Sequence, residues 1–460
     1  MPGVTWLERI MDAVADRGRE LLRLRENAAQ DTPADLCRRL IASRGEASNI
    51  ALAREILQRF EALAEGEKTA FLLTLAEEFG PDPERIRAAA SAFDNDLPAT
   101  LVDLLKAVEP PRQDLFRRLN MAPHGTAALV SMREQLLHRL PELPKLGSVD
   151  ADLKHLLASW FNRGFLRLQA IDWRSPAVVL EKLMRYEAVH PITGWEDLRR
   201  RLSEDRRCFG FFHPALPEEP LIFVEVALTQ GMAAEIAPLI DPAAPVDDPY
   251  AADTAMFYSI NNALRGLRGI SFGNFLLKQV LSELGSELPN LQQFATLSPM
   301  PRFARGLQRL CAGEVADWPV EKLDRVLDEY RDTLQAHTGD ASPCAAILHL
   351  LQHRSLENEP LLAQPLARIA LLYLVDLKQA DTCFDPVAAF HLANGAVLER
   401  INVFADRSEQ GEAQSHSVMV NYRYDPEQVV ANHEAFVREG RIAMSRSLRR
   451  VHEKYIKAEH

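Results

Sequence analysis

The chain has 460 residues, of which 47% are hydrophobic and 26% are charged, so its composition is that of a globular protein with a large core. Its 53 Lys and Arg residues against 65 Asp and Glu residues give a net charge of −12. This balance argues against a general nucleic-acid-binding protein, which needs a basic face. It leaves room for a local basic pocket that holds an anionic ligand.

The five cysteines are scattered, without a C-x-x-C pair or zinc-ligand spacing, which favours reduced thiols in a reducing cytoplasm. The first residues lack the apolar core of a secretory signal and contain too many acids for a mitochondrial transit peptide. The most apolar run, residues 361–377, is too short and too polar to cross a bilayer. We therefore expect a cytoplasmic protein that does not enter a membrane.

Residues 1–160 are predicted to be all-helical. Apolar residues recur at helical spacing, and short loops rich in proline, glycine and aspartate separate the pieces. No fixed repeat period is present, which argues against a solenoid. A helical region without a catalytic constellation is most often a packing or oligomerisation module. We predict that it forms one domain and that residues 161–460 form a second.

Beyond residue 190 the pattern becomes strand-like. The expected strands are 208–212, 221–228, 255–260, 291–297 and 387–390. A loop rich in turn formers separates the first two, and a helix to about residue 284 precedes the fourth. Helices are expected within 302–379, and a single last helix over 426–452. This order predicts an α+β domain with a mixed sheet and helical insertions.

The stretch from Arg268 to Lys278 joins a predicted strand to a predicted helix through a turn that carries Gly269 and Gly273. Glycines let the backbone approach an anion, successive N–H groups point at it, and the helix N-terminus adds positive potential. The spacing is neither a P-loop nor a dinucleotide fingerprint. It resembles the acyl-CoA pyrophosphate loop of the GNAT superfamily, Arg/Gln-x-x-Gly-x-Gly/Ala, with Ser271 in place of the middle glycine. An ordinary strand-to-helix turn is the alternative.

Three further positions carry side chains suited to chemistry. Ser298 follows an apolar strand that Pro299 must end, which would leave its hydroxyl at the carboxyl end of a sheet. His391 is expected directly after a short strand and before a turn. Tyr424 closes a stretch, 421–424, with two phenols and a guanidinium. Each also has a structural interpretation: a strand-ending Ser-Pro, a satisfied histidine and aromatic packing.

Several stretches in one order resemble the malonyl-CoA decarboxylase family, and together they cover nearly the whole chain. They are residues 190–192, 226–229, 295–301, 391–396, 400–402 and 421–424. The resemblance implies a helical oligomerisation domain followed by a GNAT-like catalytic domain. It also implies conversion of malonyl-CoA to acetyl-CoA and CO2 in fatty acid metabolism, without a metal or organic cofactor, by a homo-oligomer such as a dimer or tetramer.

Carried over position by position, the family's catalytic serine and histidine correspond to Ser298 and His391. Tyr424 corresponds to a tyrosine near the family's active site. The CoA-binding stretch corresponds to Arg268, Gly269, Ile270, Ser271, Phe272, Gly273 and Asn274. Ser271 stands where some members carry glutamate, so a catalytic role for that carboxylate does not transfer to this chain.

The implied reaction makes clear physical demands. Loss of CO2 from a malonyl thioester moves charge onto the thioester oxygen, which needs donors aimed at it, and the α-carbon then needs a proton. Ser298 would orient the malonyl end, His391 would supply the proton directly or through Ser298, and backbone N–H groups near residues 258–259 would hold the oxygen. Two alternatives stay open: an acyltransferase that acts on an amine, and a non-catalytic acyl-CoA sensor.

Overall fold

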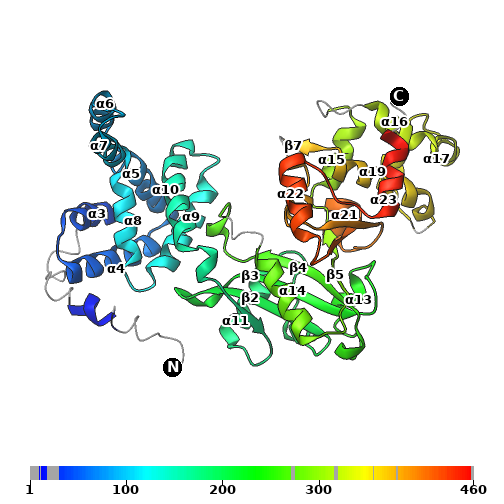
Figure 1. Cartoon of the computed structure of the whole chain (residues 1–460), viewed down its shortest axis with the longest axis horizontal. Coiled ribbons are helices and arrows are strands. Elements are labelled where there is room, and N and C mark those ends of the chain that lie inside the picture. The colour runs from blue at the N-terminus through cyan, green and yellow to red at the C-terminus, as the bar shows by residue number, and fades with distance from the viewer. Residues whose placement is uncertain are drawn as a thin grey trace. The chain divides into compact units, whose positions relative to one another are not determined.

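The computed structural model describes residues 10, 12–17, 31–270, 275–314, 320–355, 357–379 and 382–456 (Figure 1). The chain divides into two compact units. Unit 1 contains Met1–Arg167, Phe211–Ile222 and Asn262–Gly273, and unit 2 contains Leu168–Gly210, Phe223–Asn261 and Asn274–His460. Two later segments therefore group with the N-terminal helices. The predicted domains 1–160 and 161–460 stay a prediction.

Unit 1 consists mainly of helices, drawn blue to cyan in Figure 1, and the predicted helical N-terminal region is confirmed for its described residues. The helices are α3 (Pro33–Ala42), α4 (Glu46–Ala62), α5 (Glu65–Glu77), α6 (Pro83–Ser91), α7 (Pro98–Val108), α8 (Pro111–Asn120), α9 (Gly125–Arg139) and α10 (Gly147–Trp160). Short 3-10 turns are η1 (Pro144–Leu146), η2 (Arg163–Phe165) and η4 (Arg265–Leu267). Proline opens α3, α6, α7 and α8, where its missing N–H costs no helical hydrogen bond.

Within the described part of the chain, the main sheet has eight strands in the order β1-β2-β3-β4-β5-β10-β6, with β9 beside β10. They are β1 (Arg167–Ile171), β2 (Arg206–His213), β3 (Leu216–Thr229), β4 (Thr254–Asn262), β5 (Gln293–Thr296), β6 (Ser298–Pro299), β9 (Val397–Asn402) and β10 (Met419–Tyr424). β4 and β5 are parallel and α14 (Phe275–Glu287) connects them, whereas β10 is antiparallel to β5, β6 and β9. This mixed sheet confirms the predicted α+β fold class.

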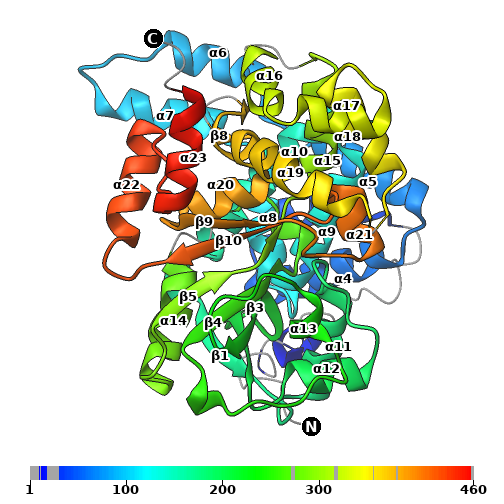
Figure 2. The same ribbon diagram turned by 90° about the vertical axis from the view of Figure 1, so that its right-hand side faces the viewer.

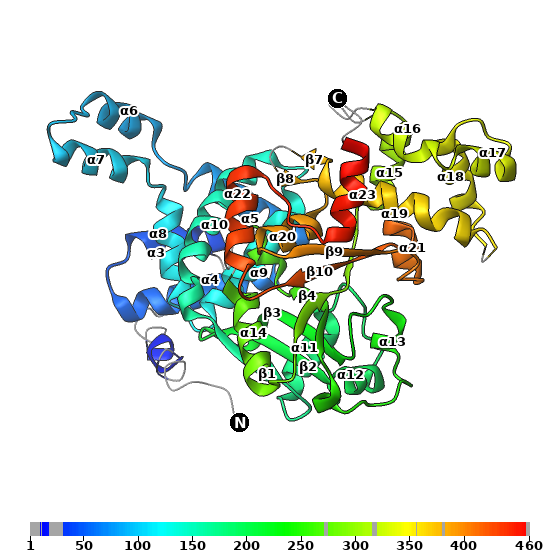
Figure 3. The same cartoon turned by 45° about the vertical axis from the view of Figure 1, so that its right-hand side comes forward.

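The remaining elements of unit 2 are mostly helices. They are α11 (Ala177–Tyr186), α12 (Trp195–Arg201), α13 (Ala237–Ile240), η3 (Pro249–Ala251), α15 (Phe303–Cys311), α16 (Val320–Asp328), α17 (Arg331–Thr338), α18 (Pro343–Gln352), α19 (Glu359–Val375), α20 (Pro386–Ala393), α21 (Glu409–Ser415), α22 (Val429–Glu439) and α23 (Arg446–Ile456), with a small sheet of β7 (Lys378–Gln379) and β8 (Thr382–Cys383). Figures 2 and 3 show α20 lying over β9 and β10. Among the described helices, none has the length and apolar content that a bilayer crossing requires.

The two faces of the central strands differ in chemistry. Met256 and Tyr258 of β4 pack with Leu297 in a buried apolar cluster. Because side chains alternate along a strand, the intervening positions point to the opposite face. Those positions include Ser259 on β4 and Thr296 on β5, and both are buried. The sheet thus has one apolar face here and one face that carries hydroxyl groups.

The predicted strand at 387–390 is wrong, because these residues belong to helix α20. The Asp385 carboxylate accepts hydrogen bonds from the backbone N–H groups of Val387 and Ala388, which caps the helix. Pro386 then occupies the first helical turn. His391 therefore lies inside a helix rather than at the end of a strand.

The predicted single helix over 426–452 is also wrong. Its residues form α22 and α23, and α22 ends at Gly440, whose φ of 64° lies in the left-handed region that glycine adopts without strain. The predicted loop between the first two strands is shorter than expected, because β2 extends to His213 and β3 begins at Leu216. The predicted helices within 302–379 are confirmed for the described residues.

Candidate active site

The parallel strands β4 and β5 pair over only four residues. Thr254 to Phe257 lie beside Gln293 to Thr296, and the backbone N–H of Leu297 donates to the Phe257 carbonyl at 2.9 Å. Ser298 pairs with Val420 of β10, the strand that also pairs with β5 at Phe294 and Ala295. The chain therefore keeps β10 as a neighbour but separates from β4 after Leu297, at the carboxyl ends of two parallel strands, which is where open α/β sheets bind ligands.

Ser298 and His391, 93 positions apart in the sequence, are hydrogen-bonded to each other beside this point. Ser298 Oγ lies 2.9 Å from His391 Nε2 and donates to Thr296 Oγ1 at 2.8 Å. His391 Nδ1 lies 2.8 Å from the Tyr424 hydroxyl. A serine that donates its one proton to Thr296 must accept from Nε2–H, so Nδ1 accepts from Tyr424. The structure therefore brings together three of the residues singled out from the sequence in one continuous hydrogen-bond chain.

The imidazole of His391 is buried and held on two sides. Its ring stacks on Tyr422 with ring centroids 4.6 Å apart and an interplanar angle of 23°. Burial lowers the pKa of His391 to about 3, because the charged form loses its solvation. Burial raises the pKa of Tyr424 well above its usual value for the same reason. Near neutral pH the side chains of this hydrogen-bonded series, from Thr296 to Tyr424, are therefore all uncharged.

Asn421 holds the Thr296 end of this chain in place. Its amide Nδ2 donates to the Thr296 carbonyl at 2.8 Å, and its Oδ1 accepts from Arg400 Nε at 2.9 Å and Asn402 Nδ2 at 2.8 Å. The backbone N–H of Tyr422 donates to Thr296 Oγ1 at 3.3 Å. These residues lie in stretches that the sequence analysis singled out, but their supporting role depends on the pairing of β9 with β10, which it did not predict.

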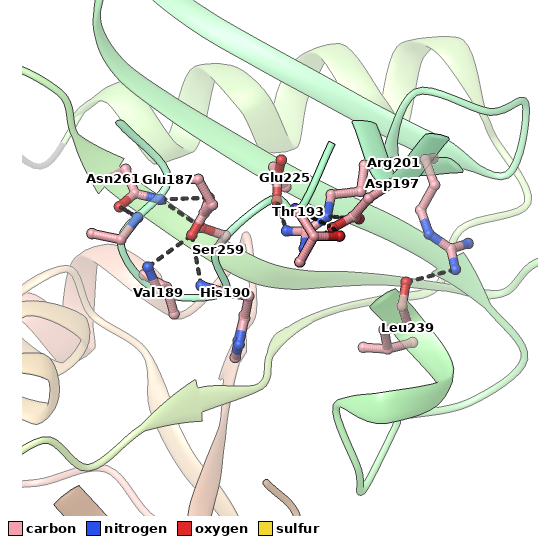
Figure 4. Close-up of polar contacts among 12 residues, drawn as sticks. Glu187, Val189, His190, Thr193, Asp197, Arg201, Glu225, Leu239, Ser259 and Asn261 are labelled. Atoms are coloured by element: carbon pink, nitrogen blue, oxygen red, sulfur yellow. Dashed lines mark hydrogen bonds and ion pairs between the residues drawn. The ribbon is translucent and has the colours of Figure 1, made fainter. Parts of the chain in front are cut away.

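A buried carboxylate, that of Glu187 directly after α11, holds the part of β4 that extends beyond the pairing with β5. Figure 4 shows the Glu187 carboxylate accepting hydrogen bonds from the backbone N–H groups of Val189 and His190, each at 2.8 Å. Its other oxygen accepts from Ser259 Oγ at 2.7 Å and Asn261 Nδ2 at 2.8 Å. Sequence reasoning missed Glu187; the only signal was its place just before the His190-Pro191 stretch.

The backbone of Ser259 faces the side of β4 from which β5 approaches. The Phe257 carbonyl points toward β5, since it accepts from Leu297. Backbone groups alternate in direction along a strand, so the N–H of Ser259 points the same way. Glu187 restrains this segment of β4 through the Ser259 side chain.

A second buried cluster in Figure 4 joins α12 to β3. Arg201 Nε donates to Asp197 at 2.8 Å and Arg201 Nη1 to Glu225 at 3.2 Å. Burial, together with the charge of Glu187, raises the pKa of Glu225 to about 8. Glu225 therefore keeps its proton to a higher pH than an ordinary glutamate does.

The predicted CoA-binding stretch is only partly described. Arg268 and Gly269 are exposed and Ile270 is buried, all in unit 1. Ser271, Phe272, Gly273 and Asn274 lie outside the described residues. Ser298, His391 and Tyr424 belong to unit 2. In the part of the chain that is described, no group of three or more His, Cys, Asp or Glu side chains is arranged to hold a metal ion.

A mixed sheet with a parallel β4–α14–β5 crossover, and a hydrogen-bonded serine and histidine where those strands end, defines an α+β protein with a candidate acid–base pair at the carboxyl ends of two parallel strands. Comparison with known proteins narrows this class. Residues 164–460 match the malonyl-CoA decarboxylase C-terminal domain, and residues 79–161 match the malonyl-CoA decarboxylase N-terminal domain. The chain belongs to the malonyl-CoA decarboxylase family, which confirms the resemblance seen in the sequence.

Relatives and solved structures agree with this assignment. The chain is 34% identical over 402 residues to the mitochondrial malonyl-CoA decarboxylase of Anser anser anser, covering 83% of this chain and 79% of that protein. It is 35% identical over 336 residues to the mitochondrial enzyme of Rattus norvegicus, covering 71% and 68%. The crystal structure of malonyl-CoA decarboxylase from Rhodopseudomonas palustris matches with a TM-score of 0.81 and 47% identity, over 90% of this chain and 98% of that one. The Agrobacterium vitis structure matches with a TM-score of 0.77 and 43% identity, over 91% and 99%.

Proposed function

We propose that this chain converts malonyl-CoA to acetyl-CoA and CO2, and that Ser298 and His391 carry the chemistry. The single observation that carries the assignment of residues is the 2.9 Å hydrogen bond between Ser298 Oγ and His391 Nε2 where β4 and β5 end. A hydroxyl and an imidazole in this arrangement can orient a malonyl group and return a proton to it. The reaction needs no metal or organic cofactor, because the thioester itself accepts the electron pair.

In the proposed mechanism the malonyl C–C bond stands perpendicular to the thioester plane. Ser298 holds the malonyl end, and the Ser259 backbone N–H donates to the thioester oxygen. The C–C bond breaks, its electron pair forms the enolate, and CO2 leaves. The proton on His391 Nε2 then moves to the α-carbon, directly or through Ser298, while the Tyr424 hydroxyl gives its proton to Nδ1. A proton from solvent then returns to Tyr424, so that each turnover consumes one proton and leaves both groups neutral.

The neutral state of His391 suits this reaction. An imidazolium would bind the substrate carboxylate, which is the ground state, and would oppose the loss of CO2. The enolate carbon is a strong base, so a neutral N–H or O–H is an adequate acid. The low pKa of about 3 that burial gives His391 supports a site that holds the proton without attracting the carboxylate.

We assign CoA binding to residues 268–274, with Arg268 as the exposed cation of that stretch. Removal of malonyl-CoA places the reaction in fatty acid metabolism. The scattered cysteines favour a reducing cytoplasm. The named relatives from goose and rat are mitochondrial proteins.

We also propose a homo-oligomer, a dimer or tetramer, formed through the helical unit. Helix α7 packs against α6 and has only Ala107 buried among its residues. It exposes a row of large apolar side chains: Leu97, Leu101, Val102, Leu105 and Val108. Apolar rows of this kind on a helix are characteristic of helix–helix interfaces, and a second copy supplies a matching surface.

The test of the function is incubation of the purified chain with malonyl-CoA alone, following acetyl-CoA and CO2. Turnover without an acceptor supports the decarboxylase. An absolute requirement for an amine acceptor would indicate an acyltransferase instead. Tight CoA binding with no turnover under either condition would leave the acyl-CoA sensor.

A further inference from the structure

We propose that the helical unit carries a phosphate-binding site of its own: Arg133 on α9 fixes the backbone of the turn at residues 265–270, and Lys154 on α10 binds a phosphate group of the CoA moiety. The inference rests on the proposed function, which places CoA at the stretch that begins with Arg268. It adds a binding role to a helical region that sequence reasoning treated as a packing or oligomerisation module.

The turn belongs with the helices by its packing. Asn262–Gly273 groups with the helical unit, and η4 packs against α9. The contact is so close that a β-carbon on Gly266 would collide with the Val130 carbonyl of α9. Only glycine fits there, so the start of the turn is seated directly on the backbone of the helix.

Arg133 fixes the orientation of two peptide groups of this turn. Its side chain is buried, and its Nη1 donates to the carbonyls of Gly266 at 2.7 Å and Arg268 at 2.9 Å. Arg133 Nε donates to the Asp150 carboxylate at 2.8 Å, which neutralises the charge and orients the guanidinium.

This orientation has a consequence for anion binding. The C=O and N–H of a trans peptide point in opposite directions. A carbonyl of Arg268 drawn toward Arg133 therefore turns the Gly269 N–H away from α9. Gly269 has a φ of +77°. The N–H groups of its neighbours Arg268 and Ile270 donate to the carbonyls of Arg265 and Leu267, so it is the N–H of Gly269 that we assign to the anion.

Lys154 brings a positive charge to the same place. Its Nζ lies 3.4 Å from the position that a β-carbon on Gly269 would occupy, and its Cε lies 3.5 Å from it. Lys154, Arg265 and Arg268 are all exposed. The turn thus carries two arginines of its own and is approached by Lys154, in a chain whose net charge is −12. An exposed ammonium beside an outward N–H suits a phosphate group.

The decisive comparison uses malonyl-CoA and malonyl-pantetheine, which lacks the nucleotide phosphates, as substrates. Lys154→Met should raise the KM for malonyl-CoA about tenfold, the value of one hydrogen bond to a charged group, and leave kcat unchanged. The kinetics with malonyl-pantetheine should not change, since it carries no phosphate for Lys154. Lys145→Met is the matched control, because Lys145 is an exposed lysine of the same unit that pairs with Glu77. Equal KM values for malonyl-CoA in wild type and Lys154→Met would overturn the phosphate role.

Arg133→Met tests the second half of the proposal. This variant should raise the KM for malonyl-CoA and leave kcat unchanged. Arg112→Met is the control: it breaks the buried ion pair of Arg112 with Asp152, so it should lower stability without changing KM. If Arg133→Met does not fold, Asp150→Asn, which removes the charge that orients Arg133, should raise KM in the same direction. An unchanged KM in the folded variant overturns the role of Arg133.

Calorimetric titration with CoA separates this inference from the proposed function. Binding of CoA needs no turnover, so Lys154→Met should weaken it about tenfold even in a chain that decarboxylates nothing. A wild type that binds CoA but never releases CO2 would refute the function and leave the phosphate site standing. A Lys154→Met variant that binds CoA like wild type would refute the phosphate site and leave the function standing.

Discussion

The carboxylate of Glu187 accepts a hydrogen bond from the Ser259 hydroxyl, 72 positions away in the sequence, at 2.7 Å. Both side chains are buried. The same carboxylate oxygen accepts from Asn261 Nδ2 at 2.8 Å. One acidic side chain thus holds the segment of β4 that follows its pairing with β5, and with it the backbone N–H proposed to hold the thioester oxygen.

We therefore expect Glu187→Gln to lower kcat more than it changes KM. Glutamine places an N–H₂ group where one of two acceptor oxygens stood, so buried donors lose their partner and the strand shifts. Loss of one oxyanion donor costs about 10²-fold to 10³-fold in kcat, and a displaced donor should cost up to that amount. Steady-state kinetics well below the melting temperature measure it.

Glu225→Gln is the control for this prediction. Glu225 is also a buried glutamate, but it contacts Arg201 rather than Ser259. Burial raises its pKa to about 8, so replacing it with neutral glutamine should cost less than at an ordinary ionised carboxylate. Equal losses of kcat in the two variants would mean that Glu187 acts on stability alone.

Local signals in the sequence predicted much of the fold but not the contacts that build the site. Residues 387–390 were predicted as a strand because they are apolar, although Asp385-Pro386 carried a helix-start signal that favours α20. Strand β10 was not predicted, although Asp425-Pro426 is a turn signal directly after its last residue, Tyr424. The hydrogen bond of Glu187 with Ser259 joins segments far apart in the sequence, and the spacing of apolar residues does not predict contacts of this kind.

The site residues were found for a different reason. Ser298, His391 and Tyr424 stand in stretches that resemble one family in one order, and the structure places all three in one hydrogen-bond chain. The composition of each stretch alone also fitted a structural role. The supporting residue Asn421 lay in the same stretches, but its function as a brace for Thr296 required the register of β10.

Replacing Ser298 or His391 should abolish most of the proposed activity. His391→Gln should lower kcat by about 10²-fold to 10⁴-fold, the range for loss of a general acid. Ser298→Ala should lower it comparably, and the double variant should lose little more, because the two act as a unit. Ser415→Ala is the control, since Ser415 is a buried serine that donates only to the Gly411 carbonyl. Near-wild-type kcat in either single variant would remove that residue from the mechanism.

The buried imidazole should also make stability depend on pH. The pKa of His391 is lowered to about 3 in the folded chain, against about 6.5 when unfolded. Between these values the unfolded chain binds more protons, so the free energy of unfolding falls as pH falls, by at most about 1.4 kcal/mol per pH unit from this group. The contribution is complete above the unfolded value. His190, whose pKa burial lowers to about 4, acts in the same direction.

Urea unfolding between about pH 7 and about pH 5 measures this effect. His391→Gln cannot titrate, so its free energy of unfolding should fall less steeply with decreasing pH than that of the wild type. The difference in slope is diagnostic, because a general loss of packing would lower stability equally at each pH. Parallel lines for the two proteins would show that His391 is not buried as a neutral group.

The apolar row on α7 should determine the oligomeric state. Leu101 and Leu105 lie one turn apart and are 47% and 58% exposed, so a double substitution to glutamate places two charges on the surface that a second copy would cover. We expect the double variant to shift to a smaller species in light scattering coupled to gel filtration, with its helical content unchanged. Val437→Glu, at a 62% exposed position on α22, is the control and should leave the mass unchanged. An unchanged mass in the α7 variant would show that the interface lies on another surface. If the variant dissociates and its kcat also falls, the assembled form is the active one.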